Sequence, residues 1–346
     1  MQRSLLGMYP EELQQLMHEW GEPAYRAQQL FHWLHRRAVL HPTAMTDLPA
    51  SLRTRIPTIG TEVVRRLQSI DGLTSKLLLR LADGQDVEAV EMRTPPPHSR
   101  KTICVSTQAG CAMGCVFCVT GQFGFARNLE AGEIVEQVLR FSREGGPVTN
   151  VVFMGMGEPL ANYDETVRAI RLLVHPAGLN LGARRITLST SGLVPQIRRL
   201  AGEGLQIGLA ISLHAPNDEL RSRLMPVNRR WPIRELLAAA DEYVERTGRR
   251  VSYEYTLMAG VNDSDELADA LARLLIGRLC HVNLIPLNPT EDPSLHAPSL
   301  ARALTFEEHL RSASIAATIR RNRGRDILAA CGQLRLSERR RAAVPA

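Results

Sequence analysis

Apolar residues near the start of the chain recur at the spacing of an amphipathic helix. Leu13, Leu16, Met17 and Trp20 follow Pro10, a residue that is favourable in the first turn of a helix. A second apolar set with the same spacing lies between residues 27 and 34. The pattern therefore predicts a small helical N-terminal domain over residues 1–60.

The spacing of apolar residues changes after residue 60. Strand-like runs at 76–81 and 87–92 flank Asp83-Gly84, a dipeptide that favours a β-hairpin. The run Pro95-Pro96-Pro97 then interrupts regular structure. We interpret residues 61–98 as a β-hairpin linking segment.

From residue 99 onwards, strand patterns alternate with helical patterns. The predicted strands are Thr102–Ser106, Asn150–Met154, Arg185–Ser189, Gln206–Ser212, Arg250–Thr256 and His281–Pro286, and the predicted helices are 130–144, 161–174, 194–203, 231–246, 264–277 and 305–322. Six β/α units predict a parallel sheet covered by helices, and they are too few for a closed eight-stranded barrel. The predicted fold class is α/β, a partial (β/α)6 barrel over 99–330 with a C-terminal tail over 331–346. Functional residues of such folds gather at the carboxyl ends of the strands.

Composition narrows the class of protein. Of the 346 residues, 44% are hydrophobic, which is enough for a normal core. The chain has no run of about eighteen apolar residues and no signal-peptide pattern, so we expect a cytoplasmic monomer that does not enter a membrane. The net charge is +6, and all basic residues except two lysines are arginines, which suit phosphate contacts or reflect genome composition. Arg26, Arg36 and Arg37 could form a basic face for nucleic acid, although an ordinary solvated helix would look the same.

Three of the six cysteines form a tight cluster. Cys111, Cys115 and Cys118 have the spacing C-x3-C-x2-C, directly after the first predicted barrel strand. Thiolates are the soft ligands of iron–sulfur clusters. Three of them leave one iron of a 4Fe–4S cluster open, and that iron can bind the amino and carboxylate groups of S-adenosylmethionine. A zinc site is the alternative, but no Cys or His follows within the next twenty residues to supply a fourth ligand.

Residues at the following strand ends are candidates for binding S-adenosylmethionine. Glycines let a backbone approach a ligand, and a glutamate can pair with an amino group. The candidates, each of which could also be an ordinary loop or capping residue, are Gly157, Glu158, Ser189, Ser212, Leu213, His214 and Asn288.

Longer motifs carry a family resemblance over essentially the whole chain. They read CAMGCVFCVTGQFGFARNL from Cys111, FMGMGEPL from Phe153, LSTSG from Leu188, ISLHAPND from Ile211, VNLIPLNP from Val282 and AACGQL from Ala329. Together they resemble the RlmN/Cfr family of radical S-adenosylmethionine RNA adenine methyltransferases.

The resemblance implies a mechanism with two S-adenosylmethionine molecules per turnover. Cys331 would accept a methyl group from the first, and a 5′-deoxyadenosyl radical from the second would activate that methyl for addition to adenine. Cys104 would resolve the adduct by forming a disulfide with Cys331, and Glu88 would accept a proton. Glu91, on the opposite side of the same predicted strand, is the alternative to Glu88. Cys280 matches no motif and is interpreted as a core residue.

The resemblance also implies substrates and partners. The motifs are closest to the type that methylates adenine C2, which implies adenosine 2503 of 23S rRNA and adenosine 37 of tRNA as targets. It further implies an electron donor such as flavodoxin or ferredoxin. Methylation of C8, as in the Cfr type, is one alternative, and a radical enzyme with a non-RNA substrate is another. A purely electron-transferring iron–sulfur protein is disfavoured because it would need four ligands rather than three.

Overall fold

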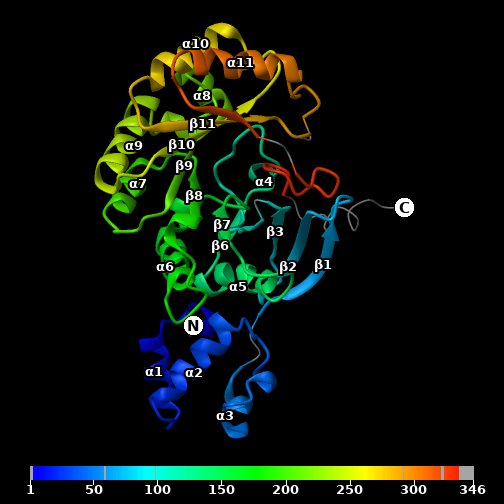
Figure 1. Ribbon diagram of the computed structural model, residues 1–346, viewed down its shortest axis with the longest axis vertical. Coiled ribbons are helices and arrows are strands. Elements are labelled where there is room, and N and C mark those ends of the chain that lie inside the picture. Colours follow the sequence, from blue (N-terminus) through cyan, green and yellow to red (C-terminus); the bar gives the residue numbers. More distant parts are fainter. Residues whose placement is uncertain (1–2, 58–59, 98, 291, 321–322, 335–346) are drawn as a thin grey trace.

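One ten-stranded sheet organises the chain (Figure 1). The computed structural model describes residues 3–57, 60–97, 99–290, 292–320 and 323–334. The strand order is β1-β2-β3-β4-β7-β8-β9-β10-β11-β12, and β4 through β12 run parallel to one another. These parallel strands are β4 (Arg100–Cys104), β7 (Asn150–Phe153), β8 (Ile186–Thr190), β9 (Gly208–Ser212), β10 (Val251–Leu257), β11 (Cys280–Pro286) and β12 (Ala317–Ile319). The six predicted strands are confirmed, and β12 is additional.

The predicted hairpin is part of the same sheet. Strands β1 (Glu62–Gln68), β2 (Thr74–Arg80) and β3 (Asp86–Thr94) pair in antiparallel fashion, and β3 pairs antiparallel with β4. The turn between β2 and β3 contains Gly84, whose φ of +80° suits glycine. Strands β1, β2 and β3 therefore extend the barrel sheet at one edge.

Amphipathic helices follow the parallel strands and cover the outer face of the sheet (Figure 1). Their bounds are α5 (Ala131–Ser142), α6 (Tyr163–Val174), α7 (Val194–Ala201), α8 (Asp218–Leu224), α9 (Ile233–Thr247), α10 (Asp265–Leu275) and α11 (Leu300–Ser312). Side chains of the residues that immediately precede these helices cap several of them. Ser264 Oγ accepts a hydrogen bond from Leu267 N–H of α10, and Asn217 Oδ1 accepts one from Leu220 N–H of α8. None of the helices in the described ranges is long and apolar enough to cross a membrane.

The helix predicted over 305–322 was wrong at both ends. Helix α11 begins at Leu300 and ends at Ser312, and the chain then forms β12. Ser314 has a φ of +61°, a left-handed conformation that ends the helix. Ala317 is buried and Ile319 packs against the core, which is the alternation of a strand.

The N-terminal helices lie at the end of the molecule opposite α10 and α11 (Figure 1). They are α1 (Pro10–Glu19), α2 (Tyr25–Phe31) and α3 (Ala50–Arg55), and α1 buries the predicted apolar side chains. An ion pair of 2.7 Å between Arg3 and Glu165 of α6 attaches them to the barrel. Arg26 and Arg36 donate to the carbonyls of Asp47 and Gly178, and Arg37 stacks on Trp33, so these arginines are partly engaged within the protein.

Candidate active site

The three clustered cysteines lie on a loop that leaves the barrel after β4. Two short strands, β5 (Gln108–Gly110) and β6 (Phe125–Asn128), pair at its base, and the short helix α4 (Val119–Gln122) follows Cys118. A Cβ atom at Gly110 would lie 2.1 Å from the carbonyl oxygen of Gly124, so only glycine allows this crossing. All three cysteines line one cavity of the barrel.

The cysteine loop suits a polynuclear cluster. Burial raises the pKa of Cys111 to about 11, and burial also raises the pKa of Cys115 and Cys118, so a bound cation is needed to hold them as thiolates near neutral pH. Within the described ranges, no three His, Cys, Asp or Glu side chains converge on a single metal ion. A cubane places each thiolate on a different iron, so its ligands need not converge on one point.

A glycine-rich turn after β7 forms a second wall of the same cavity. A Cβ atom at Gly155 would lie 2.7 Å from Ser106 Oγ, and one at Gly157 would lie 2.6 Å from Gln108 Cβ. These glycines therefore permit close packing of the turn on the chain after β4, in addition to exposing backbone to the cavity. The Glu158 carboxylate is fixed by the N–H groups of Leu160 (3.0 Å) and Ser191 (2.7 Å).

The ends of β8, β9 and β11 complete this cavity. Ser189, Ser212, His214 and Asn288 all line it, whereas Leu213 is fully buried and is not among the lining residues. Burial lowers the pKa of His214 to about 3. Its Nδ1 accepts from Thr256 N–H at 2.8 Å, so the ring is neutral and Nε2 carries the proton.

One buried polar atom indicates room for a ligand in the cavity. Asn288 Oδ1 has no hydrogen-bond partner among the described residues. Buried polar atoms are nearly always bonded, so an unpaired acceptor on a residue that lines the cavity fits a polar ligand such as S-adenosylmethionine.

Arg221 is a buried residue beside the site that the sequence did not indicate. Its guanidinium is fully buried and donates to the carbonyls of Ser191 (2.7 Å), Ser212 (2.9 Å) and Leu213 (3.1 Å) and to Asn228 Oδ1 (2.8 Å). Burial lowers its pKa to about 10, which still leaves it charged at neutral pH. Arg221 thus joins the ends of β8 and β9 on the cofactor side of the barrel.

The segment from Cys331 to Leu334 packs against the cysteine loop. Asn288 Nδ2 donates to the Cys331 carbonyl (3.0 Å), Val119 N–H to the Gly332 carbonyl (2.9 Å) and Thr120 Oγ1 to the Leu334 carbonyl (2.7 Å). In Figure 1 this segment, in red, lies beside α4. Residues 335–346 of the predicted tail lie outside the described residues.

Cys331 faces two neighbouring cavities, and Cys104 lines the second of them. Met154, Ile285, Arg320 and Cys331 line both cavities. Burial raises the pKa of Cys104 to about 12. Cys331 is more exposed than Cys104, yet the surrounding protein raises the pKa of its thiol, and the Arg320 guanidinium opposes this rise. Both thiols are free, so the predicted Cys104–Cys331 disulfide is not present in this structure.

Arg320 and Glu254 are further site residues that the sequence did not indicate. Arg320 Nη1 lies 3.6 Å from Glu254 Oε2, and Asn283 Nδ2 donates to Glu254 Oε1 at 2.7 Å. Arg320 directly follows β12, so recognition of that strand would have indicated it. Glu254 lies in the middle of β10, whereas the sequence pattern indicates candidate residues only at strand ends.

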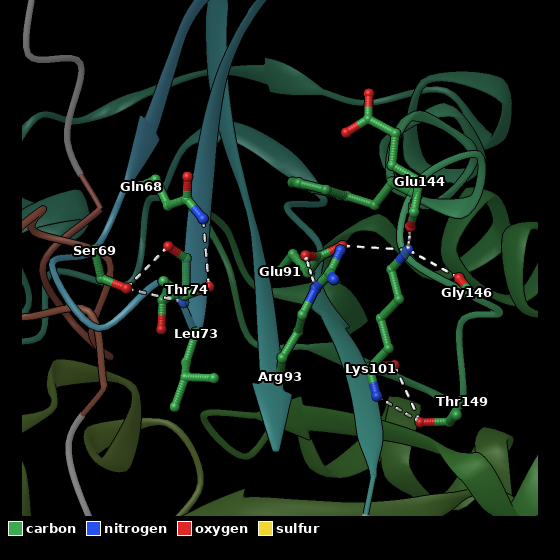
Figure 2. A network of polar contacts seen from close by, with 12 residues as sticks. Gln68, Ser69, Leu73, Thr74, Glu91, Arg93, Lys101, Glu144, Gly146 and Thr149 are labelled. Carbon is green, nitrogen blue, oxygen red and sulfur yellow. Dashed lines mark hydrogen bonds and ion pairs between the residues drawn. The ribbon is translucent and has the colours of Figure 1, made fainter. Parts of the chain in front are cut away.

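Glu88 and Glu91 lie on opposite faces of β3. Glu88 is fully buried, forms an ion pair of 3.0 Å with Lys76 and is not among the residues lining either cavity. Glu91 pairs with Arg93 (2.6 Å) and Lys101 (3.3 Å) on the other face (Figure 2). Glu88 shares its face with Met92, which lines the second cavity.

Comparison with known proteins agrees with this geometry. Residues 105–272 match the profile described as "Radical SAM superfamily", and residues 3–60 match "Ribosomal RNA large subunit methyltransferase N-terminal domain". A crystal structure of "a radical SAM methyltransferase from Sphaerobacter thermophilus" superimposes with a TM-score of 0.94 at 53% identity, covering 96% of this chain and 99% of that one.

Curated relatives extend over nearly the full chain. The "Probable dual-specificity RNA methyltransferase RlmN" of Symbiobacterium thermophilum is 53% identical, over 96% of this chain and 91% of its own length. The protein of the same name from Moorella thermoacetica is 48% identical over 97% and 98%. The "Ribosomal RNA large subunit methyltransferase N" of Nitrosopumilus maritimus is also 48% identical, over 96% and 98%.

A cysteine loop and a glycine-rich turn at the carboxyl edge of a partial barrel, together with these matches, define a radical S-adenosylmethionine methyltransferase. The match of the N-terminal domain places the chain among the members of that class that modify RNA. The chain belongs to the RlmN family of dual-specificity RNA methyltransferases.

Proposed function

We propose that this enzyme methylates C2 of adenosine, at adenosine 2503 of 23S rRNA and at adenosine 37 of tRNA, with Cys331 as the methyl carrier. One observation carries the proposal. Cys331 faces both the cavity of the three clustered cysteines and the cavity that contains Cys104. A thiol that first accepts a methyl group and later delivers it to a base needs access to both compartments.

The cofactors fit the first cavity. Cys111, Cys115 and Cys118 would hold a 4Fe–4S cluster with one open iron. Gly157, Glu158, Ser189, Ser212, His214 and Asn288, with the backbone around Leu213, would bind two S-adenosylmethionine molecules in successive steps. When bound, these groups supply the one-electron cleavage of a sulfonium that yields a 5′-deoxyadenosyl radical.

Cys331 can take part in the first group transfer because it is exposed and lines the cavity of the cysteine loop, and the Arg320 guanidinium counteracts part of the rise in the pKa of its thiol. Its Sγ forms a bond to the methyl carbon of S-adenosylmethionine, and the sulfonium–methyl bond breaks with its electron pair on the leaving thioether. S-adenosylhomocysteine departs, and the carrier is neutral S-methylcysteine. Adenine C2 is electron-poor and would not take this methyl directly, which is why a protein carrier and radical activation are needed.

Cys104 and Glu88 would act when the methylated base is released from Cys331. The Cys104 thiol, whose pKa burial raises to about 12, loses its proton as its Sγ attacks Cys331 Sγ. The sulfur–carbon bond of the adduct breaks with its electron pair on the base-bound carbon, which takes that proton to become methyl. The resulting disulfide is reduced by a cellular thiol before the next turnover. We propose that Glu88 accepts the proton that C2 loses when the base radical formed by addition gives up one electron, for which the oxidised cluster would be the acceptor. The position of Glu88 on the Cys104 side of β3 supports this role.

Mass spectrometry of nucleosides after anaerobic turnover with 23S rRNA and tRNA tests the proposal. We expect 2-methyladenosine in both RNAs. 8-Methyladenosine would assign the alternative chemistry, and no methylated nucleoside would overturn the RNA substrate.

Variants of the two cysteines test the carrier scheme. Cys331→Ala should lose all RNA methylation and the extra methyl on the peptide that contains residue 331, while keeping its iron. Cys104→Ala should keep that methyl and accumulate a covalent protein–RNA adduct on denaturing gels. Normal turnover by Cys104→Ala would overturn the resolving role.

The remaining partners follow from the chemistry. Cleavage of a sulfonium needs a low-potential one-electron donor, and we propose flavodoxin or ferredoxin. We also propose that the enzyme acts in the cytoplasm as a monomer. Reduction of the purified protein by either donor, and its mass in solution, would test these assignments.

A further inference from the structure

The second cavity is a channel along the antiparallel pair β3–β4. Cross-strand partners on one face are Thr94 and Arg100, then Met92 and Thr102, then Val90 and Cys104. Five of these six residues line the cavity, all except Val90. At about 3.4 Å per residue, the Cα of Arg100 lies about 14 Å along the strand from the Cα of Cys104. The channel thus has a reactive end at Cys104 and a rim at Arg100.

The charges along this channel are of one sign. Its described lining includes Arg100, Arg320 and Arg323 and contains no acidic side chain. Arg320 is paired with Glu254, and Arg323 lies near enough to Asp71 to help lower the pKa of that carboxyl, whereas Arg100 forms no ion pair among the described residues. A channel lined by guanidinium groups and by no carboxylate is suited to an anionic ligand.

Arg323 is held at the same end as Arg100. Its Nη1 donates to the Arg93 carbonyl and to Thr94 Oγ1, the latter at 3.3 Å. Thr94 is the cross-strand partner of Arg100, so the two arginines flank one position at the rim. Arg100 is exposed there, and its side chain has no hydrogen-bond partner among the described residues.

The proposed function places the target base against Cys104 and Cys331, and we propose that Arg100 and Arg323 bind a phosphate that flanks this base at the rim of the channel. The inference rests on the proposed function and adds a phosphate-binding pair to it. The side chain of Arg100, which lines the channel at its rim, covers part of the length of the channel, and the sugar and base of the nucleotide occupy the rest. Enzymes that modify a base inside a folded RNA must extrude it, and rim contacts to phosphate fix its register.

Replacing one charged phosphate of the RNA by a neutral methylphosphonate tests this assignment, and the experiment needs only a measurement of binding. The probe is a fluorescent RNA hairpin with the target adenosine in its loop, carrying one methylphosphonate either 5′ or 3′ of that adenosine. Dissociation constants are measured by fluorescence anisotropy with the full chain at fixed salt, because charge contacts weaken as salt rises. For the wild-type protein, one of the two methylphosphonates should weaken binding about tenfold or more, as expected for a lost charge-assisted contact.

Variants identify the partner of that phosphate. In Arg100→Ala and Arg323→Ala, the same methylphosphonate should change the dissociation constant less than about threefold, because the contact is already lost. Arg323→Lys, which keeps the charge, should recover part of the sensitivity and guards against a local misfolding effect. The matched control is Arg184→Ala, an exposed arginine before β8 at the amino-terminal edge of the sheet, which should respond as wild type does.

Two outcomes would overturn the inference in different ways. If Arg100→Ala and Arg323→Ala kept the full wild-type response, the phosphate would lie elsewhere and only the arginine assignment would fall. If the wild-type protein did not bind the unmodified hairpin, the RNA substrate of the proposed function would fall with it.

Discussion

Replacing Arg221 by methionine tests how the cofactor side of the barrel is held together. Methionine has a similar length but no donors, so three carbonyl groups and the Asn228 amide oxygen would lose their buried partner. An acceptor left unsatisfied in the interior costs about 1–3 kcal/mol. The Leu213 carbonyl keeps its bond from Ala215 N–H, so three unsatisfied acceptors, at the low end of that range, reduce the free energy of unfolding by about 3 kcal/mol.

Urea unfolding followed by circular dichroism measures that loss, and Arg223→Met is the matched control. Arg223 lies on the same helix, two residues away, but is exposed. Its replacement should change the free energy of unfolding by less than about 0.5 kcal/mol. Arg221→Met should also weaken S-adenosylmethionine binding at least about tenfold, because the strand ends with Ser191 and Ser212 lose their common anchor. A loss of stability below about 1 kcal/mol, or unchanged cofactor binding, would refute the anchoring role.

Three further outcomes follow from the described contacts. Cys118→Ala should bind no iron–sulfur cluster and release no 5′-deoxyadenosine, measured by iron and sulfide content and by chromatography; a wild-type protein that bound only zinc would contradict this. Burial lowers the pKa of His35 from 6.5 to about 3, so its contribution to stability is complete above pH 6.5 and is lost as pH falls towards 3. His35→Phe should therefore lose about 2 kcal/mol less than wild type between pH 7 and pH 5 in urea unfolding, and equal losses would exclude the His35 effect. Replacing Arg26, Arg36 and Arg37 together by Ala should lower the salt slope of RNA binding by up to about 2 to 3, and an unchanged slope would move the RNA-binding face elsewhere.

The barrel and its cysteine loop could be predicted because their signals are local. Strand ends in a parallel sheet meet at one edge, so Glu158, Ser189, Ser212 and Asn288 could be placed on one cavity from the order of elements alone. Leu213 shows the limit of this rule. Neighbouring residues at a strand end point in different directions, and Leu213 turns into the core while its carbonyl binds Arg221.

What the sequence did not reveal depends on contacts between distant segments. The charged residues around Arg221 in the sequence are typical of a helix surface. Arg221 is buried because α8 packs under the ends of β8 and β9. Arg320 was missed because Ser314 ends α11 early, and a continuous helical pattern concealed the three-residue strand that precedes Arg320. The partial engagement of Arg36 with Gly178 likewise joins residues 142 positions apart.

The wall that the two cavities share has a consequence for the order of kinetic events. Since Cys331 lines both cavities, the proposed scheme lets it be methylated from one side before RNA enters the other. The reaction would then divide into two half-reactions with methylated enzyme between them. Mixed with RNA, S-adenosylmethionine and an electron donor but no thiol reductant, methylated enzyme would complete a single round, because Cys331 would end in the disulfide with Cys104. The amplitude of that burst would count the methylated molecules.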